Sequence, residues 1–168
     1  MIRTTMAILL ALLLVITTGA ISGAEMAKEG SGDYRSGKTG TFTFIAMGKE
    51  RGQMNFEELG VVVTAPENSP FHNATFRDIG TMHFIKGKSK GSGMVEYTCV
   101  NGDKIYATFE SQGVTGGPSS SVLTLVGGTG ACTGITGTIE LRGTPGIKTS
   151  KKGTWQTISV GTLSWKIP

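Results

Sequence analysis

Short segments in which apolar and polar residues alternate are the feature of this 168-residue sequence that most restricts its fold. Period-two alternation bounded by turn residues is typical of strands that bury one face. Beyond the apolar run near the N-terminus, no segment shows a convincing helical period. We therefore expect about eight strands, over residues 39–47, 54–64, 74–85, 94–100, 103–110, 122–126, 136–142 and 153–167.

The spacing of these strands favours either an antiparallel sandwich or a closed barrel. Closure is the better solution, because it removes the edge strands that otherwise pair with other chains. The fold class that we expect is therefore an all-β, antiparallel, eight-stranded barrel. Side chains fill the interior of a barrel of this size, or it holds one small ligand.

The dipeptide Asn101-Gly102 is the clearest local signal for a hairpin. Asn-Gly suits a two-residue type I′ turn, whose twist matches that of the flanking strands. Counting back from such a turn pairs Tyr97 with Tyr106 and Cys99 with Lys104. The two tyrosines are then expected to stack on one face of the hairpin.

The N-terminus has the pattern of a secretory signal peptide over residues 1–24. Arg3 precedes the apolar run Met6 to Ile16, and Ser22-Gly23-Ala24 supplies small residues at a cleavage site. The alternative is a membrane anchor, but this run is shorter than the roughly 20 apolar residues needed to span a bilayer. We expect secretion or a periplasmic location, no stable membrane anchor, a flexible arm over 25–38 and a barrel domain over 39–168.

The sequence contains two cysteines, Cys99 and Cys132. In a secreted chain an even number suggests a disulfide, which for a loop of this length stabilises by about 3–4 kcal/mol. The alternative is that both are small buried side chains. The sequence leaves both interpretations open, because it does not supply the Cα separation that a disulfide needs.

The formal net charge of +4 is modest. Glycines and serines interrupt the small lysine groups, which favours solvated loops over a site for an anionic partner. Aromatic residues do not alternate with these lysines, so we expect no nucleic-acid partner.

Recognised catalytic, metal and cofactor motifs are not evident. The only histidines, His72 and His83, stand outside known motifs, and no short-spaced ligand pair begins a zinc site. The run Gly127-Gly128-Thr129-Gly130 lacks the Gly-Lys-Ser/Thr of a Walker loop and the following helix of a dinucleotide fingerprint. These glycines are better explained as a tight connection between two strands. We expect no catalytic residues, no metal and no cofactor.

Three segments resemble the allene oxide cyclase-like and dirigent-like β-barrels, and above all small secreted bacterial proteins of that superfamily. They are the glycine-rich stretch, with Gly128-Thr129-Gly130 and Gly134-Ile135-Thr136-Gly137, the segment from Asn101 to Tyr106, and the final run from Gly161 to Trp165, which is similar to the closing strand of such barrels. The resemblance implies a calyx-like antiparallel barrel and homo-oligomers. It transfers no catalytic residue, and Ala131-Cys132 departs from the usual charged-aromatic pair between the glycines.

The function that we expect is that of a secreted barrel acting as a non-catalytic binding or structural module. The alternative is an enzyme, cyclase-like or dirigent-like, that steers a reactive small-molecule intermediate in its cavity. An open lumen mixes aromatic and polar side chains and suits a small apolar ligand. The candidates for its lining, which otherwise fill a solid core or lie outside, are Tyr97, Tyr106, His83, Glu110 and Trp165.

Overall fold

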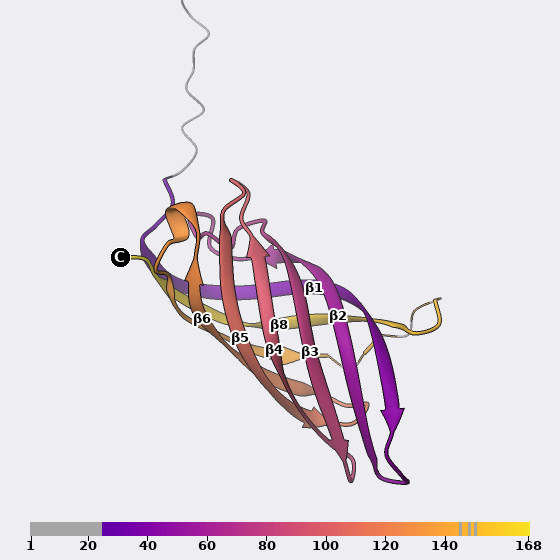
Figure 1. Ribbon diagram of the computed structural model, residues 1–168. Helices are drawn as coiled ribbons and strands as arrows, with labels where there is room; N and C mark the ends of the chain where they lie inside the picture. Colours follow the sequence, from indigo (N-terminus) through magenta and orange to yellow (C-terminus); the bar gives the residue numbers. More distant parts are fainter. Residues whose placement is uncertain (1–24, 145, 148, 150) are drawn as a thin grey trace, which may run out of the picture.

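The computed structural model describes residues 25–144, 146–147, 149 and 151–168, and it confirms the predicted antiparallel eight-stranded barrel. Each strand pairs with the next in sequence, and the last strand closes the barrel against the first (Figure 1). The strands are β1 (Glu29–Ala46), β2 (Arg51–Thr64), β3 (Thr75–Ile85), β4 (Lys88–Thr98), β5 (Lys104–Val114), β6 (Ser119–Gly128), β7 (Thr136–Gly143) and β8 (Thr154–Lys166).

The predicted signal peptide, residues 1–24, lies outside the described residues. Within the described part of the chain, no helix is long and apolar enough to cross a membrane.

The prediction of a flexible arm over 25–38 was wrong for most of that segment. Residues 29–38 form the first half of β1, which pairs with β8 from Glu29 onward. This half-strand is held in place because Tyr34 points inward and is 2% exposed. The barrel domain therefore begins at residue 29 and not at residue 39.

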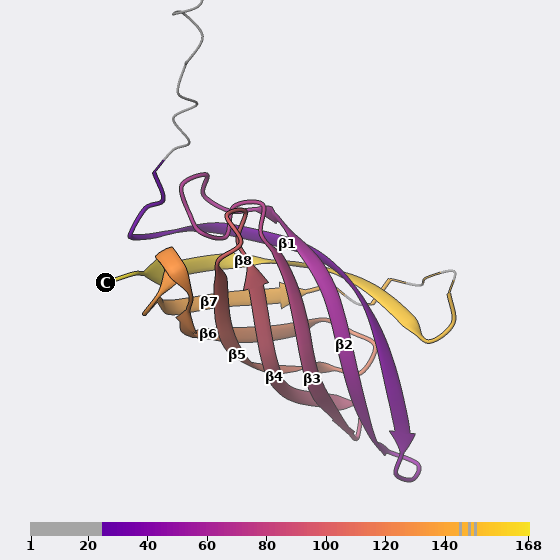
Figure 2. The ribbon, with the colours of Figure 1, turned by 45° about the horizontal axis from the view of Figure 1, so that its top comes forward.

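One end of the barrel, which we call the closed end, is filled with side chains. The β2–β3, β4–β5 and β6–β7 connections meet there, together with both ends of the described chain (Figures 1 and 2). Phe71, from the β2–β3 loop, is fully buried and its ring lies edge-on to Tyr97, with centroids 5.1 Å apart. Trp165 is buried as well and donates from Nε1 to the carbonyl oxygen of Ala27 at 3.0 Å.

The opposite end, which we call the open end, carries the other hairpins. The strands β1 and β2 extend beyond their neighbours at this end (Figure 2). Phe42 and Phe44 share the inward face of β1, as the alternation predicts. The ring of Phe42 packs against Trp155 with centroids 5.2 Å apart, and the ring of Phe44 packs against Phe84 with centroids 5.8 Å apart. They remain 38% and 49% exposed because they lie near the rim.

The predicted register of the β4–β5 hairpin was wrong by one residue. Tyr97 pairs with Ile105, and Tyr106 pairs with Glu96. The turn is longer than two residues: the amide of Cys99 donates to the Asp103 carbonyl, and only Gly102 has a positive φ, of 87°. A shift of one residue exchanges the faces of a strand, so Tyr97 points inward, Tyr106 points outward, and the two do not stack.

The glycine-rich stretch is a tight connection between two strands, as predicted. It forms a short 3-10 helix, η1 (Gly130–Cys132), between β6 and β7. The Asp103 carboxylate of the β4–β5 turn accepts a hydrogen bond from the Ala131 amide at 2.9 Å. The Lys104 amide donates to the Thr129 hydroxyl at 2.8 Å. Two of the segments that carry the family resemblance, the glycine-rich stretch and the β4–β5 turn, therefore meet at the closed end.

The two cysteines lie side by side at this contact, and both are free thiols. Their sulfur atoms are 3.9 Å apart, and both side chains are buried. Burial raises the pKa of Cys99 to about 12, and it raises the pKa of Cys132 as well. A thiolate is the reactive form of cysteine, so both thiols are protected from reagents in the folded protein.

We expect that neither cysteine reacts with a disulfide reagent such as Ellman's reagent at pH 8 while the barrel is folded. In urea without reductant, both thiols should react, because unfolding removes the burial that raises their pKa values. Thiol titration before and after unfolding measures this directly. Recovery of the thiols only after reduction would instead show that the pair is bridged.

Candidate ligand site in the barrel lumen

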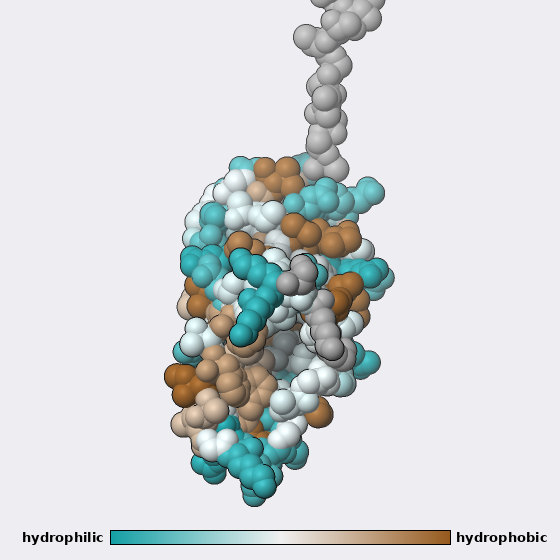
Figure 3. Space-filling model, turned by 90° about the vertical axis from the view of Figure 1, so that its right-hand side faces the viewer, coloured by the Kyte–Doolittle hydropathy of each residue, from teal (hydrophilic) through white to brown (hydrophobic). Residues whose placement is uncertain are grey.

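A cavity of about 290 Å³ occupies the barrel lumen towards the open end. Figure 3 shows the open-end side of the molecule, where the surface is hollowed and bordered by side chains of intermediate hydropathy. Aromatic rings form one part of the wall, and three charged side chains form another part. Small hydroxyl side chains line much of the remainder, including Ser36, Ser89, Ser111, Ser121, Thr157 and Ser159.

The five side chains predicted to line the lumen do not come together. Tyr97 lines the cavity, whereas Trp165 is buried in the packed closed end. Tyr106 and Glu110 point outward, because they alternate along β5 with the buried residues Ile105, Ala107 and Phe109. His83 is exposed on the outer face of β3. The prediction for Tyr106, Glu110 and His83 was therefore wrong.

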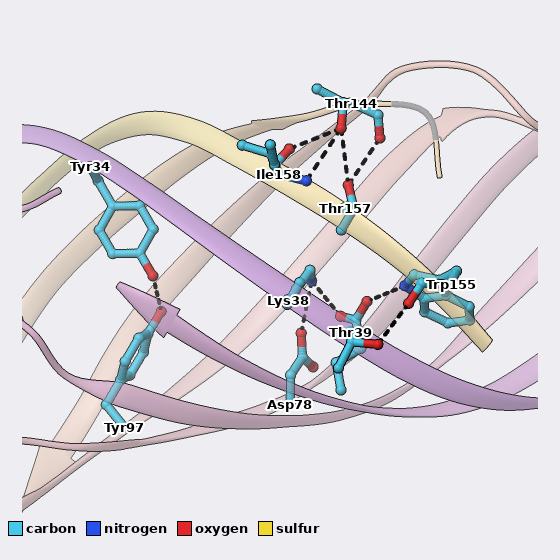
Figure 4. A network of polar contacts seen from close by, with 10 residues as sticks. Tyr34, Lys38, Thr39, Asp78, Tyr97, Thr144, Trp155, Thr157 and Ile158 are labelled. Atoms are coloured by element: carbon cyan, nitrogen blue, oxygen red, sulfur yellow. Dashed lines mark hydrogen bonds and ion pairs between the residues drawn. The ribbon is translucent and has the colours of Figure 1, made fainter. Parts of the chain in front are cut away.

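The centre of the cavity holds Lys38 of β1, Glu58 of β2 and Asp78 of β3, which we call the charged triad. Glu58 and Asp78 are paired directly across neighbouring strands, and both are buried. Like charges in such a position repel each other. The Lys38 ammonium lies between them: it forms an ion pair with Glu58 and lies 3.3 Å from Asp78 Oδ2 (Figure 4).

Trp155 of β8 fixes the orientation of Glu58 of β2 from the opposite side of β1, which pairs with both strands. Its indole Nε1 donates to Glu58 Oε1 at 2.6 Å. The two carboxylate oxygens of Glu58 thus have separate partners, Lys38 and Trp155. Asp78 is less well satisfied: its second oxygen, Oδ1, is buried and accepts no hydrogen bond among the described residues.

The pKa values follow from this arrangement. Burial raises the pKa of Asp78 to about 7; the Lys38 ammonium opposes the rise, and the negative charge of Glu58 adds to it. Burial alone lowers the pKa of Lys38, but the two carboxylates outweigh this and raise it above its ordinary value. At neutral pH Lys38 is therefore a cation, and Asp78 is close to the midpoint of its titration.

A pair of tyrosines lies deeper in the lumen. The hydroxyl groups of Tyr34 and Tyr97 are 3.3 Å apart (Figure 4). Burial raises the pKa of both groups above their ordinary range. Both are therefore neutral phenols at neutral pH, and each is able to donate or accept a hydrogen bond.

Aromatic rings surround the charged triad. Phe56 lies between Phe109 and Trp155, with centroids 6.2 and 5.6 Å away. The lumen therefore combines a wide apolar wall with a few polar groups that converge on one region, which is the composition typical of a small-molecule site.

Sequence reasoning missed all three members of the charged triad. Lys38 falls in a polar, Gly/Ser-rich segment that resembles a flexible arm, and Glu58 interrupts the apolar pattern of the strand expected over 54–64. Alternation is recognised only when the inward positions are apolar, and here they carry charge. The available signal was the regular spacing of Tyr34, Ser36 and Lys38 with Phe42 and Phe44.

We expect Asp78 to make folding less favourable as the pH rises. Its pKa is higher in the folded barrel than in the unfolded chain, so the folded form holds more protons between about pH 4 and pH 7. Stability due to this group is therefore present at low pH and lost as the pH rises through 7. A rise from 3.8 to about 7 corresponds to at most about 4 kcal/mol.

The measurement is urea unfolding of the native protein and of Asp78→Asn between pH 5 and pH 8. The variant should gain stability relative to the native protein as the pH rises, since an amide carries no charge. Glu140→Gln, on the exposed outer face of β7, is the matched control and should show no such gain. If the difference in unfolding free energy between Asp78→Asn and the native protein does not change with pH, the raised pKa of Asp78 is contradicted.

Among the described residues, no group of three or more His, Cys, Asp or Glu side chains is arranged to hold a metal ion. Lys38 is unsuited to attack on a carbonyl carbon, because it is protonated and paired with two carboxylates. The group in the lumen that is able to exchange a proton near neutral pH is Asp78.

The closed barrel and the cavity in its lumen together define a calyx-like class of protein, and comparison with solved structures agrees. The structure of the pterocarpan synthase dirigent protein GePTS1 matches with a TM-score of 0.50 and 10% sequence identity, over 83% of this chain and 90% of that chain. The chain therefore has the eight-stranded dirigent-like fold that its sequence resembles. No protein-family model matches the sequence, and no curated protein matches it.

Proposed function

We propose that this barrel binds a small, mostly aromatic molecule in its lumen, and that it acts as a binding module outside the cytoplasm. The observation that carries the proposal is the cavity of about 290 Å³, which is close to the lower end of ligand-site volumes. Its walls are aromatic, and its polar groups converge on the charged triad.

The cavity differs from a packing defect in its chemistry. A core without a ligand role is filled with apolar side chains in low-energy packing. Here a lysine and two carboxylates are removed from water at considerable expense in free energy. A ligand with one polar group and an aromatic body uses both features of the site.

A fluorescent probe of suitable size, 2-naphthol, tests this proposal. Ser121→Phe places a ring in the lumen near the open end, where Ser121 pairs with Ser111. Ser120→Phe places the same ring on the exposed outer face of the same strand. We expect saturable binding that quenches Trp155 fluorescence, is lost in Ser121→Phe and is kept in Ser120→Phe. Equal binding by both variants, or no saturable binding, would overturn the proposal.

A second candidate function is catalysis by steering a reactive intermediate in the lumen. One observation favours it: Asp78 has a pKa of about 7 inside an aromatic cavity. A group of this kind is suited to donate or accept a proton at neutral pH. The dirigent-like fold is compatible with this function but does not transfer it, because fold does not determine activity.

Exchange of carbon-bound hydrogen separates the two candidates. In D₂O, a catalytic Asp78 carboxylate would remove an α-proton from a phenyl-substituted alkyl ketone such as 4-phenyl-2-butanone and return a deuteron. Mass spectrometry would then show deuterium uptake that is faster with the native protein than with Asp78→Asn. Equal rates, together with retained binding, would favour the binding module.

A further inference from the structure

We propose that the ligand of the lumen is an organic cation, a small arylalkylamine whose ammonium group is held by Asp78 while its ring packs on the aromatic wall. This inference rests on the proposed function and deepens it, because it assigns the chemical class of the ligand. Three independent features of the cavity carry it.

The first feature is the charge balance of the lumen. The charged side chains among the described residues that line the cavity are Lys38, Glu58 and Asp78. One cation thus faces two carboxylates, so the site has an excess negative charge whenever Asp78 is ionised. The chain as a whole is basic, with a net charge of +4. The interior therefore has the opposite sign to the rest of the protein and favours a cation over an anion.

The second feature is the unpartnered oxygen of Asp78. Its carboxyl group lines the cavity and is 6% exposed as a residue. Oδ2 is directed at Lys38, whereas Oδ1 has no hydrogen-bond partner (Figure 4). Buried carboxylate oxygens without a partner are rare, and each one suggests a missing donor. An ammonium group supplies both a donor and the charge that balances the second carboxylate.

The third feature is the aromatic wall. The rings of Phe56, Phe109 and Trp155 face the lumen near the triad. The faces of aromatic rings attract organic cations, and the attraction grows when the cation is removed from water. The same rings also pack against the aromatic body of the ligand.

A proton competes with such a ligand for Asp78. The titratable groups that face this carboxyl are Lys38 and Tyr34 from β1, Glu58 from β2 and Tyr97 from β4. At neutral pH Lys38 is a cation and the tyrosines are neutral, so Asp78 is the group whose charge changes near pH 7. Binding of an amine should therefore weaken as the pH falls below 7.

The experiment compares 2-phenylethylamine with 2-phenylethanol, which have similar shapes and differ in charge. Calorimetric titration at pH 8 should show the amine binding at least tenfold more tightly than the alcohol. This preference should fall at least tenfold at pH 5, because the proton must first leave Asp78. Asp78→Asn should abolish the preference at pH 8, and Glu140→Gln, on the outer face, should retain it.

The outcomes distinguish the two proposals. If both compounds bind with equal affinity, or the alcohol binds more tightly, the inference of a cationic ligand is overturned and the proposed binding function stands. An amine preference that persists in Asp78→Asn also overturns the inference. If neither compound binds and 2-naphthol does not bind either, both proposals fail.

Discussion

Replacement of Lys38 by methionine should destabilise the barrel by about 3 kcal/mol at pH 8. The substitution keeps most of the side-chain volume but leaves Glu58 and Asp78 opposite each other without a cation. Removing one partner of a buried ion pair typically costs about 3–5 kcal/mol, because the other charge stays buried. We expect the lower end of this range, since the Lys38 side chain is 19% exposed.

Urea unfolding at two pH values checks this prediction. The loss of stability should be smaller at pH 5, because Asp78 carries a proton there and only the Glu58 carboxylate is left without a neighbouring cation. Lys166→Met is the matched control. Its ion pair with Glu29 lies at the surface, where the two side chains are 72% and 69% exposed. Exposed pairs contribute little, so this variant should lose less than about 0.5 kcal/mol.

A triple variant separates the effect of charge from that of packing. Lys38→Met combined with Glu58→Gln and Asp78→Asn removes all three charges and keeps an acceptor for the Trp155 indole. Replacing a whole buried ionic group is often neutral or stabilising. We therefore expect the triple variant to recover most of the stability lost in Lys38→Met. Failure to recover would mean that the ammonium contributes through packing and not through its charge.

The architecture of this protein could be predicted from its sequence because two local signals agree. Alternation marks the strands, and glycine-rich turns separate them, so closure into an antiparallel barrel follows from the need to remove edges. Details that depend on one residue could not be predicted. The β4–β5 turn is the example. The dipeptide Asn101-Gly102 suits a two-residue turn, but the turn that forms is longer, and within it the Asn101 side chain accepts a hydrogen bond from the Asp103 amide.

The site was harder to predict than the fold for a physical reason. Sequence patterns place apolar residues inside and charged residues outside, and a binding lumen reverses this at the positions that matter most. The charged triad is tolerated inside the barrel because its charges offset one another across three strands. The Lys38 ammonium forms ion pairs with both Glu58 and Asp78. The spacing along β1 indicates that Lys38 points inward, but its pairing with Glu58 and Asp78 depends on the register of the closed barrel.

The glycine-rich stretch carries the second large effect that we expect, at Gly137. This residue lies at the start of β7 with a φ of 140°, a conformation that side chains strongly disfavour. A Cβ atom there would collide with the Ser164 carbonyl oxygen and would lie 2.9 Å from the Cα of Trp165. The obstacle is the backbone of β8, which cannot move aside without breaking the β7–β8 pairing.

Gly137→Ala should therefore destabilise the barrel by about 4 kcal/mol, from backbone strain together with loss of close packing between β7 and β8. Gly102→Ala is the control: its φ of 87° is also positive, but the space around its missing Cβ is empty. Gly102→Ala should be destabilised by backbone strain alone, by about 1–2 kcal/mol. Thermal and urea unfolding of both variants measure the difference. Equal losses would show that close approach of β8 contributes nothing, and that the glycine is needed for its backbone conformation alone.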